Sequence, residues 1–215
     1  MARTRHDSPV RAVLVRTLVF FALVALPTMV FDLVYWSREL PWALLTPSEV
    51  ALRLTAVALA TTIVERRLAR RWMPAVVFLV AAVVYALGYV ESEYLNGMLL
   101  GHSADAGMQA LLEHGRHLLR KPRHFALLYA LVASPFAIAS TARVARLALP
   151  AATAVSTFTT LVVAILVLEP FRTEIGRVMA AFVCVRTIFV GLMLPLTGHL
   201  ADRYEARRLI QHDST

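Results

Sequence analysis

The sequence predicts an all-α membrane protein: a polytopic bundle of six transmembrane helices with an interfacial amphipathic helix in its third loop. Of its 215 residues, 59% are hydrophobic and 17% are charged, against about 45–50% and about 25% in soluble domains. The excess lies in six blocks of about 18–21 residues, the length that crosses a bilayer as helix. This composition excludes a soluble enzyme, a disordered chain and a DNA-binding domain, and we expect one integral-membrane domain over residues 1–215.

The first span is expected at about 17–36. A basic tail followed by an apolar stretch resembles a signal peptide, but this stretch has no small-x-small cleavage site and ends in Tyr35 and Trp36. We therefore interpret it as a retained span. The tail carries Arg3, Arg5, Arg11 and Arg16.

The second span is expected at about 47–64. Its predicted start is the run Thr46-Pro47-Ser48-Glu49, with an N-cap threonine, a proline at the first helical position and a glutamate at the third. The remaining spans are expected at about 73–90, 124–142, 151–169 and 178–198.

An amphipathic helix is expected at about 104–121, in the loop between the third and fourth spans. Its apolar residues recur at helical spacing, with polar residues on the other side. Such a helix can lie in the headgroup region of the membrane, or it can cap the helix bundle. The apolar residues are Met108, Leu111, Leu112, Leu118 and Leu119.

The positive charges predict the topology. If the N-terminus is cytoplasmic, thirteen basic residues fall in cytoplasmic segments and seven on the opposite side, as the positive-inside rule requires. We expect a multi-pass protein of the bacterial cytoplasmic (inner) membrane with both termini in the cytoplasm. Because the arginines stand at the ends of apolar blocks, the formal charge of +8 reflects topology, and no nucleic acid is expected as a partner.

Sequence motifs that would name a chemistry are absent. The chain has no nucleotide-binding loop, no H-E-x-x-H and no G-x-S-x-G, so we expect no cofactor, no metal and no catalytic residues. His114, His117 and His124 could share a metal ion, but the favoured interpretation is that they belong to a polar helix face. The single cysteine, Cys184, excludes an intramolecular disulfide.

Charged residues within the spans are the main candidates for a site. Arg186 lies near the middle of the sixth span, about 12 Å below its outer end, and Asp32 lies about 6 Å below the same side. A lone arginine at this depth costs roughly 2.5–3.5 kcal/mol, so it usually faces the bundle and finds a partner. The depth of Asp32 allows it to be that partner, and the order of the helices in the bundle decides whether the two residues meet.

Six charged residues are expected in the outer half of the bundle, on several helices. One interpretation is an outward-facing polar cavity that binds a charged or polar solute, or a lipid headgroup. The alternative is structural: a single Asp32–Arg186 pair, a snorkelling Arg53 and glutamates at the rim. The candidate ligand-binding residues are Asp32, Arg53, Glu91, Glu93, Glu169 and Arg186.

A polar stripe on the fifth span is the other notable pattern. Its four hydroxyl residues share one helix face, which favours packing against another helix but would also suit a solute path. They are Thr153, Ser156, Thr157 and Thr160.

Three functions follow as expectations. The first is a transporter, or the membrane subunit of a transport system, for a polar or charged solute, favoured by the outer charges and by Pro27, Pro135 and Pro195 within spans. The second is a non-catalytic subunit or assembly factor of a larger membrane complex. The third is a membrane-embedded enzyme acting on lipid, although the sequence favours a protein without enzyme activity. The expected partners are the lipid bilayer, other membrane subunits or further copies of the chain.

Overall fold

The computed structural model describes residues 9–35, 42–169 and 177–213, in which every regular element is a helix. Arg3, Arg5 and Trp36, which figured in the topology and span predictions, lie outside these residues. The elements in order are α1 (Pro9–Phe20), the π-helix η1 (Phe21–Ala25), α2 (Leu26–Tyr35), α3 (Trp42–Arg67), α4 (Met73–Gly101), α5 (Ala104–Arg120), α6 (Pro122–Val144), α7 (Leu149–Leu168) and α8 (Arg177–Asp213).

Five helices of the described chain are long and apolar enough to cross a membrane, as expected of a multi-pass membrane protein. The predicted second span, which corresponds to α3, is not among them, and Glu49 and Arg53 in its N-terminal half lower its hydropathy. The five segments are Val10–Val34, Met73–Gly101, Pro122–Val144, Leu149–Leu168 and Ala180–Arg207.

Several helix boundaries differ from those expected. The N-cap predicted at Thr46 is wrong, because α3 is already helical from Trp42. The α4 helix continues to Gly101, and α8 continues to Asp213. Both extensions carry charged residues past the apolar block, where hydropathy no longer marks the helix end.

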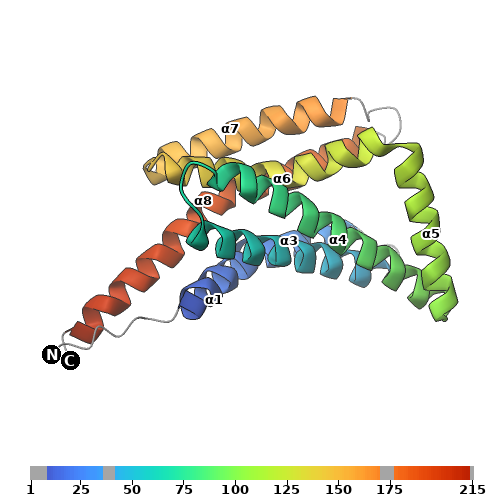
Figure 1. Ribbon diagram of the computed structural model, residues 1–215, viewed down its shortest axis with the longest axis horizontal. Helices are drawn as coiled ribbons and strands as arrows, with labels where there is room; N and C mark the ends of the chain where they lie inside the picture. Colours follow the sequence, from blue (N-terminus) through green and yellow to red (C-terminus); the bar gives the residue numbers. More distant parts are fainter. Residues whose placement is uncertain (1–8, 36–41, 170–176, 214–215) are drawn as a thin grey trace.

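The helices run up and down the bundle, so that the start of α1 and the end of α8 lie at one end and α5 lies at the other (Figure 1). Packing contacts join α4 to α3, α5 and α6, and join α8 to α1, α6 and α7. The shared core includes Phe20, Val24, Val57, Val77 and Phe136, all nearly inaccessible to solvent.

The first helix changes hydrogen-bond pattern in its middle. At η1 the backbone N–H of Leu26 donates to the carbonyl of Phe21, five residues earlier. Pro27 follows directly, and a proline lacks the N–H and crowds the carbonyl four residues before it. A π-turn at this point widens the helix, and such turns frequently occur at functional sites.

The α5 helix packs closely along the C-terminal half of α4. A Cβ atom at Gly97 would come within 2.5 Å of the Ala110 Cβ, and one at Gly107 within 2.8 Å of the Tyr94 carbonyl oxygen. The apolar face expected on α5 is only partly buried. Leu111 and Leu118 are half-buried, whereas three other apolar residues are exposed. The exposed ones are Met108, Leu112 and Leu119. Placement of α5 at the membrane surface remains a prediction.

Candidate functional site

Asp32 of α2 and Arg186 of α8 form an ion pair, the contact that their depths along the predicted spans allowed. Arg186 Nη1 donates to Asp32 Oδ2 over 3.3 Å. The Asp32 side chain is 1% exposed and that of Arg186 is 19% exposed. The second carboxylate oxygen, Asp32 Oδ1, is buried without a hydrogen-bond partner. A carboxylate with an open acceptor therefore lies inside the bundle.

Aromatic and hydroxyl side chains surround this pair. The Arg186 guanidinium lies 5.7 Å from the centre of the Phe182 ring, which stacks on Phe31. A small cavity of about 20 Å³ adjoins Arg186, with Thr187 and Tyr85 among its lining residues. A cavity of this size next to Arg186 has room for about one water molecule.

Arg53 belongs to a separate polar group between α3 and α4. It donates to Glu49 over 3.0 Å and to the hydroxyl of Ser92, which in turn donates to Glu49 over 2.6 Å. The Arg53 guanidinium lies 5.1 Å from the centre of the Tyr89 ring. The aliphatic part of the Arg53 side chain packs against Gly88, where an added Cβ would lie only 2.9 Å from the Arg53 Cγ. Arg53 is therefore bound within the bundle.

The three remaining candidates are dispersed. Glu93 is half-buried and shares a hydrogen bond with Tyr89, next to the Arg53 group. Glu91 is exposed on α4, and Glu169 is exposed at the end of α7. The six candidate residues thus occupy several positions in the half of the bundle predicted to be the outer one, and among these six residues the structure pairs Asp32 directly with Arg186.

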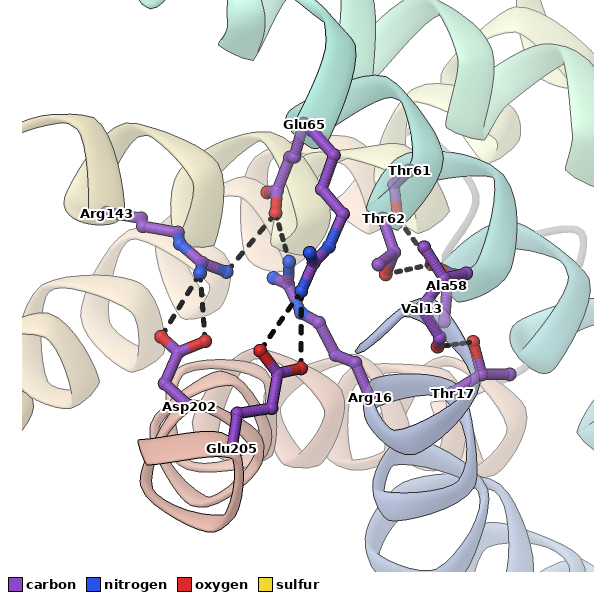
Figure 2. A network of polar contacts seen from close by, with 11 residues as sticks. Val13, Arg16, Thr17, Ala58, Thr61, Thr62, Glu65, Arg143, Asp202 and Glu205 are labelled. Atoms are coloured by element: carbon purple, nitrogen blue, oxygen red, sulfur yellow. Dashed lines mark hydrogen bonds and ion pairs between the residues drawn. The ribbon is translucent and has the colours of Figure 1, made fainter. Parts of the chain in front are cut away.

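The sequence reasoning missed a second charged group, at the end of the bundle predicted to face the cytoplasm (Figure 2), which we call the inner charged group. Glu65 of α3 accepts from Arg16 over 2.5 Å and lies 3.5 Å from Arg143 of α6. Arg143 also donates to both oxygens of Asp202 on α8, over 3.0 and 3.1 Å. Arg66 donates to Glu205 over 3.3 and 3.4 Å. The available signal was Glu65, Asp202 and Glu205 among arginines predicted to be cytoplasmic, which were interpreted only as topology markers.

An apolar layer separates the two charged groups. Phe20, Val24, Val57 and Phe136 are each at most 3% exposed, and the rings of Phe20 and Phe136 are 6.1 Å apart. Val24 lies midway in sequence between Arg16 and Asp32, and sixteen helical residues between those two correspond to about 24 Å. We call these four side chains the apolar seal.

The polar stripe of α7 packs against α8. Ser156 and Thr160 are fully buried, and the Ser156 hydroxyl donates to the Gly191 carbonyl over 2.6 Å. A Cβ at Gly191 would come within 2.6 Å of the Thr160 hydroxyl oxygen. The stripe therefore serves close helix packing, the first of its two expected roles.

The histidines of the α5 region do not converge. His114 is buried between the rings of Tyr89 and Phe125, at 4.9 and 5.2 Å, whereas His117 is exposed beside Glu113. Among the described residues, no group of three His, Cys, Asp or Glu side chains could hold a metal ion.

Comparison with known proteins identifies no relative. No protein-family model matches the chain, and no curated protein or solved structure is similar to it. The features of this chain that bear on function are the two charged groups and the apolar seal between them.

Proposed function

We propose that the protein is a transporter, or the membrane subunit of a transport system, for a polar or charged solute. The observation that carries this proposal is the buried pair of Asp32 and Arg186, in which Asp32 Oδ1 has no partner. Ionisable groups inside a membrane bundle are costly, and they commonly mark ion and solute pathways. The open oxygen of Asp32 can accept a proton, a cation or the ammonium group of a solute.

The order of side chains along the bundle also supports transport. A polar outer group, the apolar seal and a polar inner group follow one another between α1–α2, α3, α6 and α8. This is the arrangement of a path closed in the middle. Helix discontinuities accompany it, namely the π-turn before Pro27 and the internal prolines Pro135 and Pro195, and such sites can act as hinges.

We propose that α3 also crosses the membrane, which gives six spans. Its charges are paired at both ends, Glu49 with Arg53 and Ser92, and Glu65 with Arg16 and Arg143. These contacts remove the main obstacle to burying α3 among other helices. With six spans, both termini lie in the bacterial cytoplasm. Reporter fusions after Thr215 and within residues 103–110 should then report opposite sides, and a report from the same side would contradict this topology.

Cysteine labelling tests transport without knowledge of the solute. In a Cys184→Ser background, Thr187→Cys introduces a thiol beside Arg186, on the outer side of the seal. We expect a membrane-impermeant thiol reagent to label it from the outer face of spheroplasts and also from the cytoplasmic face of inverted vesicles. Labelling from both faces requires the seal to open toward each side in turn.

Two control variants accompany this measurement. Thr61→Cys, on the inner side of the seal, reports that the reagent reaches the cytoplasmic end. Leu79→Cys, at a site 62% exposed on α4, should stay unlabelled because it faces lipid. If Thr61→Cys reacts in inverted vesicles while Thr187→Cys does not, the bundle is static and transport is refuted.

A static bundle would favour the second candidate, a non-catalytic subunit of a membrane complex. The exposed apolar stripe on α5 formed by Met108, Leu112 and Leu119 supports this alternative. Apolar side chains exposed in this way are typical of a surface that contacts lipid or another subunit.

A further inference from the structure

A pocket of about 400 Å³ opens beside the inner charged group, where α3, α4, α6 and α8 meet. Five arginines and three carboxylates line it, so the pocket has a net positive charge. Two apolar residues, Met73 and Val144, complete the wall. The arginines are Arg16, Arg66, Arg70, Arg143 and Arg146, and the carboxylates are Glu65, Asp202 and Glu205.

The three carboxylates are already used by three of the arginines. Glu65 is shared by Arg16 and Arg143, and Arg143 also holds Asp202 (Figure 2). Glu205 is held by Arg66. Within the described part of the chain, neither Arg70 nor Arg146 has an acidic partner. The excess positive charge of the pocket therefore belongs to these two side chains.

The backbone at Arg146 adopts a conformation that is unusual for an arginine. Arg146 has φ 53°, in the left-handed region. It ends α6 with paired hydrogen bonds from Leu147 N–H to the Ala142 carbonyl and from Arg146 N–H to the Arg143 carbonyl. Glycine is the usual residue at this position because a Cβ is strained there. An arginine at a strained backbone position in a basic pocket is the kind of outlier that suggests a binding role.

We infer that this pocket binds a phosphate group through Arg70 and Arg146. The planar guanidinium is suited to phosphate because it can donate two parallel hydrogen bonds. Basic pockets between membrane helices on the cytoplasmic side bind the headgroups of anionic lipids, and the volume falls in the range of small-ligand sites. The phosphate comes either from such a headgroup or from a soluble phosphate anion. This site does not depend on the proposed transport.

Thermal unfolding of the full chain in detergent tests the inference. The probes are cardiolipin and phosphatidylglycerol as lipid sources, and inorganic phosphate and pyrophosphate as soluble sources, all at constant ionic strength. We expect at least one of them to raise the Tm by about 5–10 °C at a hundred times its Kd. Zwitterionic phosphatidylcholine should not. A lipid-only response identifies a headgroup, and a response to phosphate or pyrophosphate identifies a soluble anion.

The decisive variant combines Arg70→Gln with Arg146→Gly. Glycine relieves the strained backbone, so the variant should fold with an unchanged or higher Tm in the absence of anion. We expect it to lose at least half of the shift caused by the anion. The matched control combines Arg116→Gln with Arg120→Gln on α5. It removes an equal number of positive charges at the other end of the bundle and should keep the full Tm shift caused by the anion.

The inference is overturned if no anion raises the Tm of the unmodified chain. It is also overturned if the pocket variant keeps the full shift, or if the α5 control loses as much of it. In the last case the response reflects net charge alone.

Discussion

Replacing Asp32 by asparagine should strongly destabilise the bundle. Asp32 is 1% exposed and is bound to Arg186. Removing one member of a buried ion pair costs about 3–5 kcal/mol, because it leaves the other charge without compensation. Since Arg186 is 19% exposed and the contact is a single one at 3.3 Å, we expect about 3 kcal/mol.

The reverse replacement should cost less. In Arg186→Leu the remaining carboxyl of Asp32 can take up a proton, whereas an arginine cannot lose one inside a protein. The double variant, Asp32→Asn with Arg186→Leu, removes both charges and should be close to the unmodified chain in stability. The three variants form a double-mutant cycle, and because one single variant costs about 3 kcal/mol while the double variant costs little, the expected coupling is at least about 3 kcal/mol.

Equilibrium unfolding in mixed micelles measures this cycle. Asp202→Asn is the matched control, because Asp202 also pairs with an arginine but its side chain is 52% exposed. Its loss should cost at most about 1 kcal/mol. A coupling below about 0.5 kcal/mol between Asp32 and Arg186, or a control as damaging as Asp32→Asn, would refute this account of the pair.

Two further predictions concern helix packing and the inner charged group. Gly191→Ala should destabilise the α7–α8 contact by about 1–3 kcal/mol, because the new Cβ would lie 2.6 Å from the Thr160 hydroxyl oxygen. Gly115→Ala is the control: a Cβ there has nothing within 4 Å, so this variant should be neutral or stabilising by up to about 1 kcal/mol. Thermal unfolding of both variants measures the difference. Glu65→Gln should lower the Tm, because it leaves Arg16, 16% exposed, without its carboxylate. If the additional Arg16→Gln fails to restore the Tm, the pairing is not the cause.

Much of the fold could be predicted because hydropathy reports burial in lipid directly. The apolar blocks locate five of the helices, and depth along the helix suggested that Asp32 and Arg186 could meet. The ends of the helices were harder to predict from the sequence. The start of α3 was placed at Thr46 from a capping pattern, yet the helix begins at Trp42, and Glu49 instead accepts hydrogen bonds from Arg53 and Ser92.

The inner charged group could not be predicted because it depends on helix order. Glu65 is on α3 and Arg143 is on α6, and α4 and α5 lie between these two helices in the chain. A single sequence does not show which helices are neighbours in the bundle. Arginines at span ends also have a sufficient explanation in topology. Their second role becomes visible only when Glu65, Asp202 and Glu205 are placed among them.

The first helical segment, α1–η1–α2, and the last helix, α8, have the same spacing between their charged residues. This shared spacing explains how the Asp32–Arg186 pair and the inner charged group can form at the same time. On the first helix Arg16 precedes Asp32 by sixteen residues, and on α8 Arg186 precedes Asp202 by the same number. The two helices run in opposite directions, so each end of the bundle receives an arginine from one and an aspartate from the other. A slip of one turn, about 5.4 Å, would separate Asp32 from Arg186 and move Asp202 away from Arg143.

This matched spacing also constrains any movement. In the proposed transporter, opening of the outer end would require the Asp32–Arg186 pair to part, while the inner end would remain closed by the contacts of Glu65 with Arg16 and Arg143. Opening the inner end requires the reverse. Because exposing both charged layers at once would break both sets of ion pairs, the states with one end open are the less costly ones. An arrangement that opposes simultaneous opening is what a transporter needs to avoid a leak.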